Sequence, residues 1–474
     1  MSSCNHPSLR LDVSPHAAAT GFSRPALARR QAATTPSGRV TNKQDVLQNH
    51  ARLESLFPAP LVLPGDALAV DPGASPPQSL RSWVQDKNRN PVTPQRKTIY
   101  VAPTPSFAPE LGPAYPLEWQ PPAIKLPGVD KGVGRACFDA RSVRDYLEAF
   151  YHPLPVKMLP GEVRWVPWSE DGGRRRGPKD GRYLGLQIGD GVTRIAVRRC
   201  PDEAYRHQLR VGDLLDALAD ALPRDAYALL LVTEADMYED DEDEFCCGRA
   251  YGGSRVAVVS GARYHPVFDA ARGGREHDWP FSHCAEFVGS LCEGDGTGSS
   301  SGERGDRSSS KGRKTDGEAL LSGSGADAVM EAVVQAGLNL PAPSPLQDRS
   351  TPRPDPGAPS SLLWLSRVAR TAAHEVGHCF CLEHCSYYAC IMQDTSGMSE
   401  DLRQPPYLCL VCLAKLERAV LDGVSGSPAD DGAAFCIARY EALVRLCARW
   451  EHAAPMWAAY RRWLETRIEM LKNP

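Results

Sequence analysis

The sequence lacks a long hydrophobic run. Its longest apolar stretch, Ala226 to Val232, falls far below the ~18 residues that a membrane-spanning helix requires. Met1 to Arg30 is rich in Ser, Pro and Ala and has no apolar core of signal-peptide length. We therefore expect an intracellular, cytoplasmic protein with no membrane association. The Ser-rich, Arg-bearing and acid-poor residues before Gln44 leave an organelle as an alternative location. A nuclear location also stays open.

An excess of basic charge is also lacking. The 54 Lys and Arg residues are outnumbered by 58 Asp and Glu residues, and the formal net charge is −4. A chain of this balance has no basic surplus that would bind phosphate backbones by releasing their counterions. We therefore expect no nucleic-acid partner.

Proline and glycine are abundant, with 41 and 40 residues, and they cluster. Residues 1–130 show little apolar periodicity, so we expect them to be mostly disordered or to lie along the surface of a core. One catalytic domain is predicted over residues 135–470, in a chain that we expect to be a monomer. Flexible insertions are predicted at about 293–317 and 340–359, where core-forming residues are scarce.

Apolar patterns within this domain indicate both helices and strands. Residues four or three apart form apolar faces in some segments, and others alternate or are continuously apolar. The predicted fold class is therefore α/β. The expected helices are Ser142–Tyr151, Leu209–Leu222 and Leu362–Phe380, a short helix is expected within Ser324–Gly337, and the expected strands are Tyr227–Thr233, one or two in Arg182–Val197, and a hairpin of Phe245–Arg249 with Arg255–Ser260.

Three histidines form the motif that carries chemistry. His374 and His378 are four residues apart on the expected helix, so both imidazoles project from one side and can share a metal ion. His384 follows, and this arrangement arises by chance at a rate of roughly 0.0005 per chain of this composition. Three histidines leave the fourth position of a tetrahedral zinc open, which is typical of catalytic sites. Glu375 lies beside the first ligand, where its carboxylate can take a proton from a metal-bound water.

Four cysteines follow the third histidine in two pairs. Cys385 and Cys390 precede Cys409 and Cys412 by a loop of the length found in zinc sites. In an intracellular protein, clustered cysteines bind metal more often than they form disulfides. Four thiolates suit a closed, structural zinc site, and buried unpaired cysteines are the alternative.

These motifs together resemble the archaemetzincin family of metallopeptidases. The residues that carry the resemblance are His-Glu-Val-Gly-His-Cys-Phe-Cys-Leu-Glu-His-Cys from His374, then Cys390-Ile-Met392, and later Cys409-x-x-Cys412. The resemblance implies a metzincin-like α/β domain with a twisted mixed sheet and an active-site helix. It also implies two zinc ions, one on the three histidines and one on the four cysteines, Glu375 as general base, and Met392 as the methionine beneath the catalytic metal. Met398 competes for that last position.

One residue departs from the family pattern. Cys381 stands where the family usually has glycine, at the turn after the helix. A residue with a side chain costs ~1–2 kcal/mol in the left-handed conformation that such a turn uses. The departure leaves two alternatives open: a weakened zinc site, or Cys381 or Cys379 as an additional thiolate near the metal.

The sequence thus predicts a zinc metallopeptidase acting on peptide or protein substrates. An extended substrate would lie beside an edge strand, for which Arg255 to Arg263 is the candidate. Tyr387 and Tyr388 are close enough in sequence to steady an oxyanion, but neither is assigned this role. A non-catalytic zinc scaffold and a zinc hydrolase of non-peptide substrates are the alternative functions.

Overall fold

The computed structural model describes residues 4–74, 76–112, 119, 122, 138–168, 183–272, 274–293, 325–340, 358–424 and 432–473. The contacts divide the chain into two compact units. The first unit contains Met1–Val84, His277–Leu338 and His384–Ala414, and the second contains Gln85–Glu276, Asn339–Glu383 and Lys415–Pro474. Within the described ranges, no helix combines the length and apolar character needed to cross a membrane.

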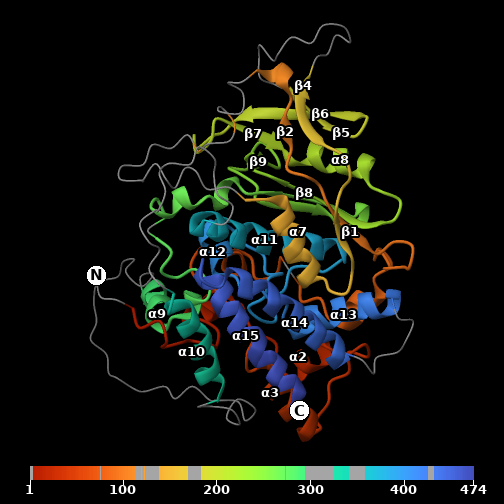
Figure 1. Ribbon diagram of the computed structural model, residues 1–474. Coiled ribbons are helices and arrows are strands. Elements are labelled where there is room, and N and C mark those ends of the chain that lie inside the picture. The colour runs from red at the N-terminus through yellow and green to blue at the C-terminus, as the bar shows by residue number, and fades with distance from the viewer. Residues whose placement is uncertain are drawn as a thin grey trace. The chain divides into compact units, whose positions relative to one another are not determined.

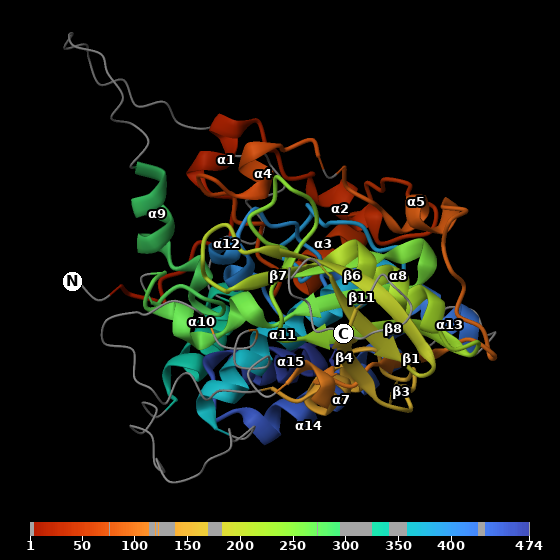
Figure 2. The same cartoon turned by 90° about the horizontal axis from the view of Figure 1, so that it is seen from above.

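A five-stranded, mostly parallel sheet forms the centre of the second unit (Figure 1). Its strand order is β10-β11-β8-β1-β3, and Figure 2 shows β11, β8, β1 and β3 side by side. All eight residues of β8 are buried, as expected for a strand covered on both faces. The prediction of a buried strand here is confirmed. The bounds are β1 Thr98–Val101, β3 Val156–Met158, β8 Ala226–Thr233, β10 Gly248–Tyr251 and β11 Val256–Ser260.

A second sheet packs on one face of the first through α8 (Val211–Ala221). Leu229 and Leu231 of β8 share a hydrophobic cluster with leucines of α8 and with apolar residues of this second sheet. The predicted strand signal over Arg182–Val197 corresponds to two antiparallel strands, β5 and β6. The order is β2-β4-β5-β6-β7-β9, with bounds Ser106–Phe107, Val163–Pro167, Tyr183–Ile188, Gly191–Arg199, His207–Arg210 and Met237–Tyr238.

Helices cover the other face of the five-stranded sheet (Figure 1). The helix α11 (Pro359–Cys379) contacts β8, β10 and β11, and α7 (Ala140–Phe150) contacts β1 and β3. The apolar face predicted for α7 is buried, including Val143 and Tyr146. The remaining elements are α13 Leu410–Val424, α14 Gly432–Trp450, α15 Pro455–Lys472 and the 3-10 turns Pro109–Leu111, Gly252–Ser254, Ala262–Tyr264 and Pro266–Asp269. The chain is therefore mixed α/β, as predicted.

The first unit consists of short helices joined by long loops. Its small clusters include Ala17, Phe22, Val62 and Leu68, and Arg30 forms an ion pair with Glu54 at 2.6 Å. The elements are α1 Pro15–Thr20, α2 Leu27–Ala33, α3 Gln44–Glu54, α4 Ala67–Val70, α5 Leu80–Gln85, a 3-10 turn at Phe281–His283, α9 Ala285–Glu293, α10 Gly325–Leu338 and α12 Met398–Arg403.

This organisation differs from the expectation of a mostly disordered 1–130 segment and a single domain over 135–470. Residues 4–112 form helices and strands because isolated apolar residues meet partners that are distant in sequence, a signal that local periodicity does not contain. The helix expected within Ser324–Gly337 is α10. The predicted insertions at about 293–317 and 340–359 fall almost entirely outside the described residues.

Candidate metal centres

The last two turns of α11 bring His374 and His378 together. Their Nε2 atoms lie 3.0 Å apart and their ring centres 4.7 Å apart. Two imidazole nitrogens bound to one tetrahedral zinc would be ~3.3 Å apart, given zinc–nitrogen bonds of about 2.0–2.1 Å. The pair therefore faces a common point at nearly the separation that a shared metal ion requires.

The tautomer of His378 is fixed by the turn after the helix. Its Nδ1 donates a hydrogen bond to the carbonyl of Leu382 at 2.7 Å. Because Nδ1 holds the proton, Nε2 keeps the lone pair that binds a metal. Hydrogen-bonding the outer nitrogen of a ligating histidine in this way also fixes the orientation of its ring.

That turn is a Schellman motif with Cys381 at its left-handed position. Leu382 donates its backbone N–H to the carbonyl of Gly377 at 3.2 Å, and Cys381 donates to the carbonyl of His378 at 2.8 Å. These two bonds end the helix in the pattern that usually has glycine as the left-handed residue. Cys381 has φ +57°, so the conformation expected from the family's glycine is present without the glycine.

Glu375 is buried against the edge strand of the five-stranded sheet. A Cβ atom added to Gly248 of β10 would lie 2.5 Å from Oε1 of Glu375, closer than real Cβ contacts permit. A Cβ added to Gly252 would lie 2.5 Å from the carbonyl oxygen of His378. Glycine at these two positions lets the hairpin approach the helix beside Glu375.

The prediction that Arg255 to Arg263 forms an edge strand is wrong. The strand β11 lies inside the sheet, parallel to β8 on one side and antiparallel to β10 on the other. Residues Ala262–Tyr264 form a 3-10 turn. The hairpin itself was predicted correctly, but strand alternation does not reveal which of its two strands joins the sheet interior. Among the described strands of this sheet, β10 and β3 are the edges, and β10 is the edge strand next to β11.

His384 begins the last segment of the first unit and lies beside an acidic residue. Its Nδ1 is 3.4 Å from Oδ2 of Asp394. A carboxylate at Nδ1 favours the tautomer whose Nε2 is available as a ligand. Met392 is fully buried, and its carbonyl accepts a hydrogen bond from the N–H of Cys385 at 2.7 Å. Met398, the competing methionine, is only partly buried at the start of α12.

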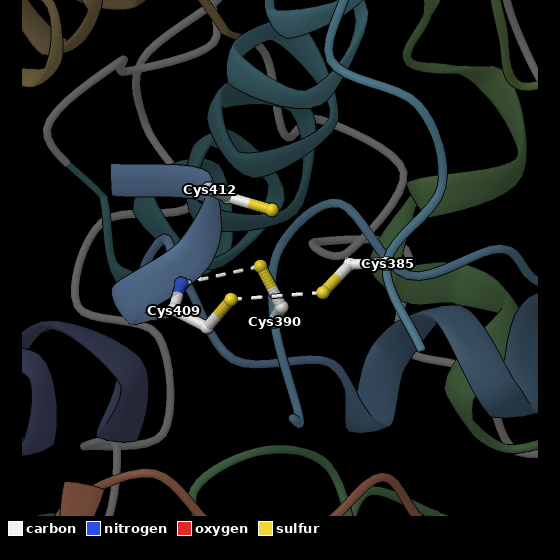
Figure 3. A group of neighbouring side chains, drawn as sticks. All are labelled: Cys385, Cys390, Cys409 and Cys412. Carbon is white, nitrogen blue, oxygen red and sulfur yellow. Dashed lines mark hydrogen bonds between the residues drawn. The ribbon is translucent and has the colours of Figure 1, made fainter. Parts of the chain in front are cut away.

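The four predicted cysteines form one cluster in the first unit. Their sulfur atoms all lie within 4.8 Å of one another and all four residues are buried. Figure 3 shows Cys385 and Cys390 on a loop, with Cys409 just before α13 and Cys412 in its first turn. Cys385 and Cys409 have their sulfurs 3.6 Å apart. Four buried sulfurs this close together suit the closed tetrahedral site that the sequence predicts.

Backbone N–H groups point at one of these sulfurs. Cys390 Sγ accepts from the N–H of Cys409 at 3.3 Å and from that of Met392 at 3.5 Å. Burial raises the pKa of the Cys390 and Cys409 thiols well above the ordinary value. Thiolates at this depth require a cation, and donated N–H groups support the thiolate form.

The other candidates have different environments. The Sγ of Cys379 donates weakly to the carbonyl of Glu375 at 3.9 Å, and that of Cys381 donates weakly to the carbonyl of Asn88 at 3.7 Å. The hydroxyl of Tyr388 donates to Glu54 at 2.7 Å, and that of Tyr387 donates to the carbonyl of Pro77 at 3.3 Å. Neither pattern supports an additional thiolate ligand or an oxyanion role.

The sequence does not predict the roles of two residues of the site, Asp394 and Gly248. Asp394 carries no motif of its own, and its role emerges only when its carboxylate is seen beside His384. Gly248 lies in a predicted strand, where a glycine can mark close backbone approach. That signal was present in the sequence, but it does not identify Glu375 as the neighbour.

Comparison with known proteins gives similarity concentrated in this region. The family model described as peptidase family M54 matches residues 358–418, which include all seven predicted metal ligands. Archaemetzincin-2 from Homo sapiens is 24% identical over 388 residues, covering 82% of this chain and 73% of that protein. Archaemetzincin from Methanopyrus kandleri is 37% identical over 65 residues, covering 14% of this chain and 37% of that protein. The crystal structure of the Methanopyrus kandleri protein matches with a TM-score of 0.30 and 16% identity, over 69% of this chain and 97% of that one.

Proposed function

Because the chain belongs to the archaemetzincin family and is a metallopeptidase, we propose that it hydrolyses peptide bonds at a zinc ion held by His374, His378 and His384. The observation that carries the proposal is the pair of Nε2 atoms 3.0 Å apart on α11. His384, six residues beyond His378, supplies the third ligand. Substrates are peptides or proteins.

The residues fit a zinc ion by their chemistry. His378 has its proton fixed on Nδ1 by the Leu382 carbonyl, and Asp394 favours the same tautomer in His384. Three neutral imidazoles that each turn an Nε2 lone pair to one ion would form a catalytic zinc site with an open fourth position. When bound, zinc polarises a scissile carbonyl and lowers the pKa of a coordinated water.

Glu375 is the proposed general base. Its carboxylate takes the proton of the attacking water and passes it to the leaving amine. The neighbouring edge strand β10 is the proposed binding strand for an extended substrate, whose backbone would pair with the free edge. Because Gly248 lies against Glu375, a peptide beside β10 would have its backbone close to the base.

A second zinc is proposed on the four cysteines, where no open position remains and the role is structural. Met392 is proposed as the methionine beneath the catalytic metal. Its carbonyl accepts a hydrogen bond from the N–H of Cys385, the residue after His384, so the methionine's segment also supports the third histidine.

Replacement of Glu375 tests the catalytic proposal. Glu375→Ala and the isosteric Glu375→Gln should keep their zinc and lose at least about 100-fold in peptide hydrolysis, a typical value for a general base. Glu331→Gln, which changes an exposed carboxylate on α10, is the matched control and should retain activity. A screen of peptides together with ester and non-peptide amide substrates identifies the class that is cleaved.

The zinc content of two variants distinguishes the catalytic hypothesis from a non-catalytic zinc scaffold. His378→Ala and Cys412→Ser should each remove one zinc per chain, and only the first should leave the four-cysteine centre loaded. A chain that hydrolyses nothing and keeps all of its zinc in His378→Ala would be a scaffold instead, with the strained turn at Cys381 as the physical reason.

A further inference from the structure

The N-terminal segment pairs with the residues that lead into α9. Leu9 and Cys284 form an antiparallel bridge. Arg10 donates its N–H to the carbonyl of His283 at 2.8 Å, and Ala285 donates to the carbonyl of Ser8 at 2.8 Å. This pairing lies within the first unit and places residues near Leu9 beside residues near Cys284, which are far from them in the sequence (Figure 1).

We propose that Cys4, His277 and Cys284 form a third zinc centre. One ligand atom from each residue lies within 4.8 Å of the others. On a tetrahedral zinc, two sulfurs would be ~3.8 Å apart and a sulfur and a nitrogen ~3.6 Å apart, given the usual bond lengths. The three side chains therefore need only small movements to close around one ion.

His6 is assigned as the fourth ligand, which requires a movement of its side chain, because it lies outside the group whose ligand atoms are all within 4.8 Å of one another. Its ring centre lies 5.4 Å from that of His277, with the rings inclined by 65°. Two imidazoles on one tetrahedral zinc have ring centres ~5 Å apart. The Nδ1 atom of His6 is buried and finds no hydrogen-bond partner among the described residues. Buried polar nitrogens are normally satisfied, and a metal bond would satisfy this side chain.

The surroundings hold the two histidines in place. His277 stacks on Phe287 of α9, with ring centres 3.9 Å apart and planes inclined by 9°. His6 lies 5.2 Å from the ring of Phe281. Cys284 is fully buried. Rings held by aromatic packing lose little additional freedom on binding a metal, which favours a preformed site.

Two thiolates and two imidazoles are the ligand set of structural zinc. All four positions are filled by protein, so this centre has no open position for substrate. Its consequence is mechanical: the metal would tie Cys4 and His6 to the start of α9. The proposal does not depend on peptidase activity.

Zinc content of the full-length chain tests this centre. After saturation with zinc alone and removal of the excess, the chain should retain three zinc ions. Cys4→Ser and His277→Ala should each retain two, whereas Cys292→Ser, a cysteine of α9 outside the cluster, should retain three. Cys4 is only partly buried near the N-terminus, so its replacement should not prevent folding.

Cobalt and mass spectrometry complete the test. Cobalt titration of Cys4→Ser should lose part of the thiolate-to-cobalt charge-transfer absorption relative to Cys292→Ser. His6→Ala should bind the third zinc at least about 10-fold more weakly, and an unchanged affinity would overturn the assignment of His6. An unchanged zinc content in Cys4→Ser, or a Cys4–Cys284 disulfide in the protein as isolated from cells, would overturn the centre itself.

Discussion

Replacing Cys381 with glycine should stabilise the protein. Cys381 holds φ +57° at the end of α11, where a side chain costs ~1–2 kcal/mol relative to glycine. Glycine loses more backbone entropy on folding, which offsets about 0.5–1 kcal/mol of that gain. The thiol that is removed donates weakly to the carbonyl of Asn88 at 3.7 Å. The net increase in the free energy of unfolding is therefore about 0.5–1 kcal/mol.

The matched control is Cys381→Ala, which removes the same thiol and keeps a Cβ at positive φ. We expect Cys381→Ala to stay within about 0.5 kcal/mol of the parent chain. Because unfolding entropy is ~2.1 cal/mol/K per residue, a gain of 1 kcal/mol in a unit of about 300 residues raises its midpoint by about 1–2 °C. Scanning calorimetry and urea unfolding of zinc-saturated protein would measure the difference. A glycine variant no more stable than the alanine variant would refute the strain argument.

Three further predictions concern zinc binding, peptide hydrolysis and the dependence of stability on pH. Asp394→Ala should weaken zinc binding at the histidine site by about 10–100-fold, the usual effect of losing a carboxylate behind a ligating histidine, with the four-cysteine zinc retained. Gly248→Ala should lower peptide hydrolysis by at least about 10-fold, because a Cβ there meets Glu375 at 2.5 Å; Gly253→Ala, whose Cβ would meet nothing within 4 Å, is its control. Burial lowers the pKa of His283 to about 4 from 6.5, so its stabilisation is present above pH 6.5 and is lost as pH falls toward 4. Unfolding measured across this range should show a decrease on the order of 3 kcal/mol that His283→Gln reduces.

Elements of the second unit could be predicted where one local pattern determined one structure. The continuous apolar run of β8 and the apolar face of α7 had a single good interpretation, because each element meets the core along its whole length. The four-cysteine cluster was predictable for a similar reason: ligand spacing in sequence limits where the sulfurs can meet.

The first unit could not be predicted in this way. Its α1 has six residues and its α4 has four, too short to show a period. What stabilises such helices is contact across long sequence distances, as between Glu400 and the N–H of Ala67. The edge position of β10 is equally non-local, because it depends on which strand β8 accepts as its neighbour.

Two metal centres are proposed on adjacent residues, His384 and Cys385. One peptide bond therefore links the ligand shells of a catalytic and a structural ion. Loading the cysteine centre would fix the backbone of residue 385, so that His384 samples fewer orientations before it meets its own ion. The entropy cost of ordering His384 would then fall on binding of the structural ion rather than on binding of the catalytic ion. The structural ion would thus act as an assembly factor for the catalytic one, and a chelator that removed it would also weaken the catalytic site.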